Sequence, residues 1–190
     1  MQWATAFGIG CGSGGDASIK QKLRAVLSCG KPAVIDADGL NNLDNELKKL
    51  LSLRHVLTPH PGEMARLTGK SIEDVLRDPA GFAENTAKAF GCIVLLKGAV
   101  SVAAHPDGRL RYNASGNPGL AKGGSGDVLT GIITALLAQG LEPFDAASAG
   151  AYILGSSAES ALELLHERAL TAGDVLDAIE KTAGITEHRN

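Results

Sequence analysis

The sequence predicts an α/β fold in which a mostly parallel sheet lies between layers of helices. Short apolar runs, such as residues 32–36 and 92–97, alternate along the chain with longer segments of helical apolar spacing, and this alternation is typical of β-α units. Many of the 24 glycines gather in turns, where an α/β enzyme needs them. With 190 residues, the chain is expected to form a single domain, residues 1–190.

The expected strands are short and rich in apolar residues, as strands buried on both faces of a parallel sheet are. The first ends at a glycine cluster and the third ends at Pro59. The sequence Pro106-Asp107-Gly108 between two further short runs indicates an antiparallel hairpin. In chain order, the expected strands are residues 4–9, 32–36, 55–58, 92–97, 101–104 and 109–112.

The expected helices have apolar residues at helical spacing, and several begin or end at recognisable caps. Asp16 is a suitable cap for the first helix, and Ser71 and Thr171 each precede an aspartate by three residues in the capping-box pattern. Gly69 is expected to end one helix, and a break is expected near Gly155 in the longest one. In chain order, the expected helices are residues 16–27, 43–51, 63–67, 71–77, 80–90, 128–139, 143–166 and 172–182.

Composition excludes several classes of function. The 18 basic and 21 acidic residues give a net charge of −3, and without a basic stripe nucleic-acid binding is not expected. One Trp, two Tyr and four Phe leave little material for stacking on bases. No apolar run reaches membrane-spanning length, and the N-terminus does not resemble a secretory signal. Three widely spaced cysteines are interpreted as reduced thiols of a cytoplasmic protein.

The most informative segment is the glycine-rich stretch of residues 117–127, which leads into the expected helix 128–139. Gly123, Gly124 and Gly126 allow the backbone to come close to a ligand. A glycine-rich loop that opens a helix directs several backbone N–H groups and a partial positive charge at one point, which suits a phosphate group. Asp127 at this point either caps the helix, as aspartates often do, or handles a proton or a metal.

Four further loops at expected strand ends carry polar or glycine residues, and ligands of open α/β sheets bind at the carboxyl ends of strands. Each loop also has a plain structural interpretation as a turn, a cap, a surface loop or a strand end. The joint occurrence of all four favours a ligand site. His60 and Glu63 have the spacing of a metal pair, but a third ligand is not evident. The loops are residues 10–15, 36–41, 58–63 and 97–98.

Together these segments occur in the order and approximate spacing of one enzyme family. The chain resembles the ADP/ATP-dependent NAD(P)H-hydrate dehydratases from Ala4 to about Ile179, through residues 10–14, 36–38, 58–63, 97–98 and 116–127. The resemblance implies a ribokinase-like three-layer sandwich, with a mostly parallel central sheet flanked by helices and a C-terminal antiparallel hairpin. It also implies conversion of the S epimer of hydrated NADH or NADPH to the reduced dinucleotide. ADP or ATP would phosphorylate the added hydroxyl, and phosphate would then be eliminated.

The resemblance also implies roles for individual residues. Asp127 would be the catalytic base and contact the hydrated dinucleotide, and Asp38 would orient Mg²⁺ through water. The other substrate-binding residues would be Gly12, Gly14 and His60. The nucleotide-binding residues would be Lys97, Gly98, Ala99, Val100, Ser101, Asn117, Gly123, Gly124, Ser125 and Gly126.

The chain departs from the family pattern at three points. The family's usual N-terminal segment is lacking, which would leave a sheet edge exposed. Cys11 stands where the family often has Pro, and Gly39 where Ala is usual; neither is expected to affect the chemistry. We expect a homo-oligomer. Two alternatives remain at this point: a ribokinase-like kinase acting on a small molecule, and a non-catalytic nucleotide-binding fragment.

Overall fold

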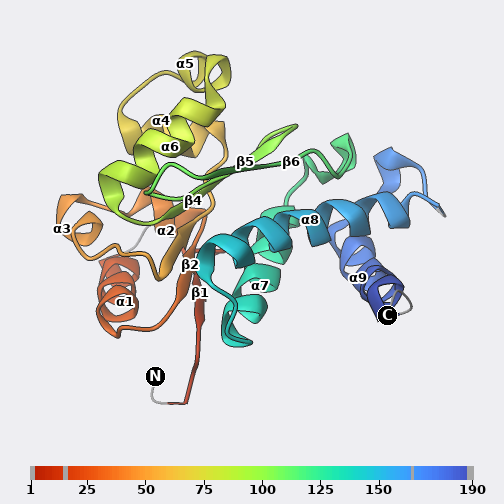
Figure 1. The fold of residues 1–190 in the computed structure, drawn as a ribbon, viewed down its shortest axis with the longest axis horizontal. Helices are drawn as coiled ribbons and strands as arrows, with labels where there is room; N and C mark the ends of the chain where they lie inside the picture. The colour runs from red at the N-terminus through yellow and green to blue at the C-terminus, as the bar shows by residue number, and fades with distance from the viewer. Residues whose placement is uncertain (1–2, 15–16, 164, 188–190) are drawn as a thin grey trace.

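A sheet of six strands lies at the centre of the computed structural model, which describes residues 3–14, 17–163 and 165–187 (Figure 1). The strands lie in the sheet in the order in which they occur in the chain, so that β1 and β6 form its two edges. β1 to β4 are parallel, whereas β5 is antiparallel to both β4 and β6. The bounds are β1 (Phe7–Ile9), β2 (Ala33–Ile35), β3 (His55–Leu57), β4 (Ile93–Leu96), β5 (Ser101–Ala104) and β6 (Leu110–Asn113).

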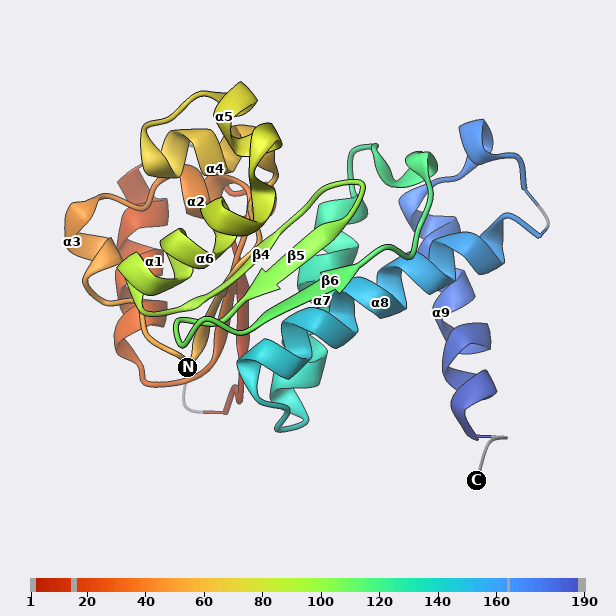
Figure 2. The same cartoon turned by 45° about the horizontal axis from the view of Figure 1, so that its top comes forward.

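Helices cover both faces of the sheet, which confirms the predicted three layers (Figures 1 and 2). One face carries α1 (Ala17–Ser28), α2 (Asp38–Asn41), α3 (Asn45–Lys48), α4 (Pro61–Thr68), α5 (Ile72–Arg77) and α6 (Pro79–Phe90). The other face carries α7 (Ser125–Ala138) and α8 (Pro143–Ala161), with α9 (Ala172–Glu187) packed on α8. Two 3-10 turns, η1 (Pro118–Leu120) and η2 (Glu167–Ala169), lie in the connections. Of the helices described, none combines the length and the apolarity that a bilayer crossing requires.

β2, β3 and β4 are mainly apolar along their whole length because each of them contributes to two cores. Ile35 and Leu57 pack with the residues of α1 to α6, whereas their neighbours Val34 and Val56 pack with α7, α8 and α9. Successive side chains of a strand point to opposite faces. With both faces covered by helices, no position in these strands needs to be polar.

The predicted break near Gly155 is wrong, because α8 continues through this residue to Ala161. A β-carbon at Gly155 would lie 2.2 Å from Ser115 Oγ and 2.6 Å from the Ser115 carbonyl oxygen. The glycine therefore allows the segment after β6 to approach the helix rather than interrupting it. The end of the helix also differs, since His166 lies outside α8 and caps η2.

Other boundaries differ because short local contacts decide them. The expected helix 43–51 is reduced to α3, since Asp44 accepts hydrogen bonds from the N–H groups of Glu46 and Leu47 and caps it. Residues 38–41, expected as a loop, form the single helical turn α2. The predicted capping box at Thr171 is confirmed, and Ser71 caps α5 by accepting from the Asp74 N–H while its hydroxyl donates to the Asp74 carboxylate. The predicted cap Asp16 lies outside the described residues.

His55 is a buried histidine at the start of β3. Its ring is 1% exposed, Nδ1 accepts a hydrogen bond from the Ser52 N–H at 3.0 Å, and Nε2 has no partner among the described residues. Burial, assisted by the charge of Arg54, lowers the pKa of His55 from 6.5 to about 4. The folded protein therefore keeps this imidazole neutral at a pH where the unfolded chain protonates it.

The unfolding free energy is therefore expected to fall as the pH decreases from about 6.5 to about 4, by up to about 3 kcal/mol from His55 alone. The sign follows because the unfolded chain binds one more proton than the folded protein in this interval. Urea unfolding of the wild type and of His55→Gln at several pH values measures the effect. In His55→Gln, the slope of the unfolding free energy against pH should be smaller than in the wild type by the equivalent of about one proton. The control His166→Gln, at an exposed histidine, should keep the wild-type slope. Identical slopes for wild type and His55→Gln would contradict the assignment.

Candidate active site

The loops that carry the expected site residues follow the carboxyl ends of the parallel strands. Gly12 and Gly14 follow β1, Asp38 follows β2, His60 follows β3 and Lys97 follows β4. Because these strands are parallel neighbours, the four loops lie next to one another at the carboxyl ends of the strands. The structure thus gathers residues that are far apart in the chain.

The N-terminus of α7 also lies at the carboxyl ends of these strands, where Gly126 is next to Asp36 and Lys97. Gly124, with φ of 93°, is its N-cap and supplies no side chain, so the interpretation of Asp127 as the N-cap is wrong. Asp127 is the third residue of the helix, and its side chain is exposed. The N–H groups of the first helical turn have no acceptor within the helix and carry its partial positive charge. An acidic side chain and free amide donors are thus presented together.

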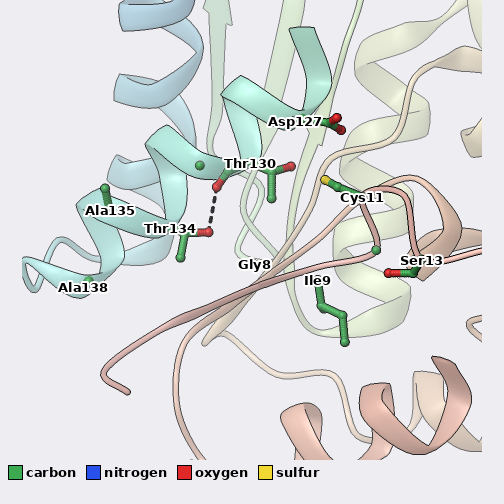
Figure 3. A pocket seen from close by; sticks show the side chains of 11 residues that line it. Gly8, Ile9, Cys11, Ser13, Asp127, Thr130, Thr134, Ala135 and Ala138 are labelled. Carbon is green, nitrogen blue, oxygen red and sulfur yellow. Dashed lines mark hydrogen bonds between the residues drawn. The ribbon is translucent and has the colours of Figure 1, made fainter. Parts of the chain in front are cut away.

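A groove of ≈ 570 Å³ runs from Asp127 along α7 and the edge strand β1 (Figure 3). At its upper end in the figure, the side chains of Asp127, Thr130 and Cys11 lie near one another. Beyond these three side chains, the side of the groove that α7 forms consists of small residues. The described residues that line the groove are Gly8, Ile9, Gly10, Cys11, Ser13, Asp127, Thr130, Gly131, Thr134, Ala135 and Ala138.

Cys11 contacts the proposed base, which the sequence did not lead us to expect. Burial, a hydrogen bond with Asp127 and the charges of Asp127 and Asp36 together raise the pKa of Cys11 to about 11, against an opposing hydrogen bond from Thr130. The group is therefore a thiol at neutral pH and a poor nucleophile. The thiol shares the groove with Asp127, and the expectation that the Cys11 departure leaves the chemistry unaffected stays a prediction.

A buried ion pair lies beneath the first turn of α7. Lys97 Nζ is 2.7 Å from Asp36 Oδ1 and 3.9 Å from Glu63 Oε2. The two carboxylates are almost fully buried, whereas the Lys97 side chain is 23% exposed. A β-carbon at Gly126 would lie 3.5 Å from Lys97 Nζ and 3.1 Å from Asp36 Oδ2. The structure thus places Lys97 directly against the glycine-rich helix start.

His60 has a structural role that sequence reasoning missed. It is the N-cap of α4: Nδ1 accepts from the N–H groups of Gly62 and Glu63, and the Glu63 carboxylate accepts from the His60 N–H at 2.8 Å. Because Nδ1 is an acceptor, the neutral ring carries its proton on Nε2. The side chain remains 51% exposed. The ring is therefore oriented by the cap while the side chain stays half exposed. Residues 60–63 fit the capping-box pattern, with His in place of Ser or Thr, and that pattern could have revealed this role.

Asp38 links two of the predicted loops. Its Oδ2 accepts a hydrogen bond from the Gly14 N–H at 2.8 Å, which ties the glycine loop after β1 to α2. Across residues 3–14, 17–163 and 165–187, no group of three or more His, Cys, Asp or Glu side chains is placed to hold a metal ion. A hard cation here would have few protein ligands.

The other residues expected to bind the nucleotide outside α7 and its preceding glycines lie in two segments, the loop between β4 and β5 and the residues around Asn117, which are exposed or half-exposed. Gly98, Ala99 and Val100 form the loop between β4 and β5, where the Gly98 N–H is 3.4 Å from Ser101 Oγ. Asn117 caps η1 through the N–H of Gly119. The groove is not lined by Lys97 or His60, as far as the described chain shows.

Lys122 braces the glycine-rich segment and was not identified from the sequence. Its Nζ donates to the carbonyl oxygens of Arg168 at 2.9 Å and Leu170 at 2.7 Å. This contact joins the loop before α7 to η2 and to its C-cap Leu170, just before α9. A lysine that binds backbone carbonyls so distant in the chain leaves no local pattern in a sequence.

Comparison with known proteins places the chain in a family. The sequence profile described as NAD(P)H-hydrate dehydratase matches residues 1–181. The chain belongs to the NAD(P)H-hydrate dehydratase family. It is 41% identical over 180 residues to the ADP-dependent (S)-NAD(P)H-hydrate dehydratase of Neisseria meningitidis serogroup B, covering 91% of this chain and 61% of that protein. The chain spans between 28% and 61% of the lengths of the first curated relatives that it matches.

Solved structures of the NAD(P)H-hydrate dehydratase family share the fold. The chain superimposes on the ADP/ATP-dependent NAD(P)H-hydrate dehydratase of Bacillus subtilis, co-crystallised with ATP/Mg²⁺ and soaked with CoA, with a TM-score of 0.84 and 30% identity over 95% of this chain and 66% of that one. A ribokinase-like superfamily protein of Enterococcus faecalis gives a TM-score of 0.77 at 27% identity, covering 94% of this chain and 62% of that one. The predicted ribokinase-like fold and the family resemblance are both confirmed.

Proposed function

We propose that this chain dehydrates the S epimer of hydrated NADH or NADPH with ADP or ATP as co-substrate, as a hydro-lyase of nicotinamide nucleotide repair. The observation that carries the proposal is the placement of Asp127. It is an exposed acid in the first turn of α7, beside amides without helical acceptors and at the end of a groove. The names of the Neisseria and Bacillus relatives support the same substrates.

The proposed chemistry has two steps. Asp127 takes the proton of the hydroxyl that hydration added, and the hydroxyl oxygen attacks the terminal phosphoryl group of the nucleotide, whose bond to the bridging oxygen breaks to release AMP from ADP or ADP from ATP. Backbone N–H groups of residues 123–126 stabilise the charge that develops on this group. Phosphate then leaves with the electrons of the carbon–oxygen bond, the neighbouring carbon of the hydrated (tetrahydro) ring loses a proton to solvent, and the restored double bond gives the dihydronicotinamide.

The other residues bind the two reactants. Lys97 and the loop of residues 98–101, together with Asn117 and residues 123–126, hold the nucleotide. His60, Gly12 and Gly14 hold the hydrated dinucleotide. The capped ring of His60 supports this role, because its orientation is set before a ligand arrives.

Mg²⁺ is proposed to accompany the nucleotide. The donor set fits a cation held largely by phosphate oxygens, because Asp38 is a single carboxylate with one oxygen engaged by Gly14. Asp38 would orient such an ion through water, and the ion would neutralise phosphate charge. We further propose that residues 1–190 form one domain, which acts in the cytoplasm as a homo-oligomer.

The proposed activity is tested by adding the chain to the S epimer of NADH hydrate with Mg²⁺ and either ADP or ATP. We expect absorbance of reduced nicotinamide to return and one phosphate to be released for each NADH formed. Nucleotide binding without any turnover would contradict the proposed activity and favour a non-catalytic binding chain. A phosphorylated alcohol that accumulates without elimination would instead indicate a kinase.

A further inference from the structure

Asp36 is a buried acid to which the proposed reaction gives no role. It is 1% exposed at the end of β2, and three groups donate to its carboxylate. These are Lys97 Nζ at 2.7 Å, the Ala37 N–H at 2.8 Å and Thr130 Oγ1 at 3.1 Å. A buried carboxylate is costly unless its partners are well placed. Here one acid joins β2, β4 and α7.

The bond to Thr130 determines how α7 is oriented. Thr130 follows Asp127 by three residues, so both lie on the same side of the helix. Figure 3 shows both side chains directed to the side of the Cys11 loop. Fixing the Thr130 hydroxyl to Asp36 therefore fixes the direction in which the Asp127 carboxylate extends.

The bond to Lys97 places a cation against the same helix start. Gly126 lies over the ion pair so closely that a β-carbon would come within 3.1 Å of Asp36 Oδ2. The second carboxylate, Glu63, is farther from the ammonium at 3.9 Å and also caps α4. Asp36 thus accepts hydrogen bonds from both Lys97 and Thr130, and in this way it connects Lys97 with α7.

The backbone next to Asp36 is strained in keeping with this arrangement. Ala37 has φ of 46° and ψ of −119°, and among the described residues no other non-glycine has a positive φ. Such conformations persist when the surroundings enforce them. The Ala37 N–H is the one bound to Asp36 Oδ1.

We propose that Asp36 is a positioning residue that holds the Lys97 ammonium and the first turns of α7 in a fixed relation, so that Asp127, the α7 amides and Lys97 face one phosphoryl group. This inference rests on the proposed function, since it assigns Lys97 and α7 to the same nucleotide. Asp36 acts through Thr130 and Lys97 and does not itself contact the reactants.

Thr130→Val and Thr130→Ser test the link to α7. Valine keeps the shape of threonine but cannot donate to Asp36, whereas serine keeps the hydroxyl. We expect Thr130→Val to lower kcat by about 10- to 100-fold with KM for the nucleotide within about threefold, and Thr130→Ser to stay near wild type. Ile133→Val, at a fully buried position of the same helix, controls for lost stability and should keep the wild-type kcat. Equal kcat for Thr130→Val and wild type would overturn the proposal.

Asp36→Asn tests the link to Lys97 without requiring turnover. Calorimetry should show ATP·Mg²⁺ binding weakened about tenfold, because Lys97 loses its charged partner. Asp44→Asn removes the charge from an exposed lysine–aspartate pair, Lys20 with Asp44 at 3.2 Å, and should leave this affinity unchanged. Unchanged affinity in Asp36→Asn would overturn the inference even if the chain is an active dehydratase. A wild type that binds ATP without turnover would overturn the proposed function alone, and the calorimetry would still decide the role of Asp36.

Discussion

Asp127→Asn is expected to lower turnover by about two to four orders of magnitude while ADP and ATP affinity changes little. Asparagine has nearly the shape of aspartate but cannot accept the hydroxyl proton. The nucleotide is proposed to bind through backbone amides of residues 123–126, which the substitution leaves in place. Because Asp127 is exposed and does not cap α7, the fold should be retained. Steady-state kinetics with the NADH hydrate and calorimetry with ADP measure the two effects.

Asp145→Asn provides a matched control for this prediction. Asp145 is also the third residue of a long helix, α8, and its partner is Arg111 on the β6 strand rather than a groove residue. Both substitutions remove one acid from a helix N-terminus, so both lose the same small interaction with the helix dipole. Only Asp127→Asn should lose turnover. Substantial turnover in Asp127→Asn would rule out its role as the base.

Gly10→Ala is expected to lower the unfolding free energy by about 3 kcal/mol or more. Gly10 has φ of +120°, and a β-carbon there would lie 1.9 Å from the Asp36 carbonyl oxygen and 2.6 Å from the Gly39 nitrogen. These are backbone atoms, which cannot rotate away as a side chain can. The loop after β1 or the segment of residues 36–39 must shift, so the Asp36 contacts should weaken as well.

Gly12→Ala in the same loop separates steric overlap from backbone strain. Gly12 also has a positive φ, +59°, but a β-carbon there would meet nothing within 4 Å. Its substitution should therefore cost only the left-handed strain, about 1 kcal/mol. Denaturant unfolding of both variants gives the comparison. Equal losses would show that the approach of Gly10 to Asp36 is not the dominant constraint.

Local patterns predicted most of the fold correctly. The buried parallel strands were recognisable because each is short and mainly apolar, and Ser71 and Thr171 marked helix starts through contacts only three residues away. Some helix boundaries were wrong because of local caps, as at α3, and the predicted break at Gly155 was wrong because a distant segment intervenes. In the sequence, Gly155 indicates a helix break. In the structure, its missing side chain allows Ser115, forty residues earlier in the chain, to pack against α8.

In the candidate site, too, some residues could be proposed from the sequence and others could not. The glycine-rich helix start, Asp127 and Lys97 could be proposed from the sequence because each stands out within its own segment. Their partners could not. Lys97 meets Asp36 across 61 residues of chain, and Thr130 meets Asp36 across 94.

By itself, the sequence determined the layered α/β architecture, because apolar periodicity and glycine-rich turns act over a few neighbouring residues. Its motifs indicated the family by resemblance and the segments of the candidate site as a prediction. Only the tertiary structure decided that Cys11 lies against Asp127 and that Asp36 binds both Lys97 and α7. The physical reason is that strand order and helix packing select which distant side chains meet, and a buried charge is tolerated only where that packing supplies its partners.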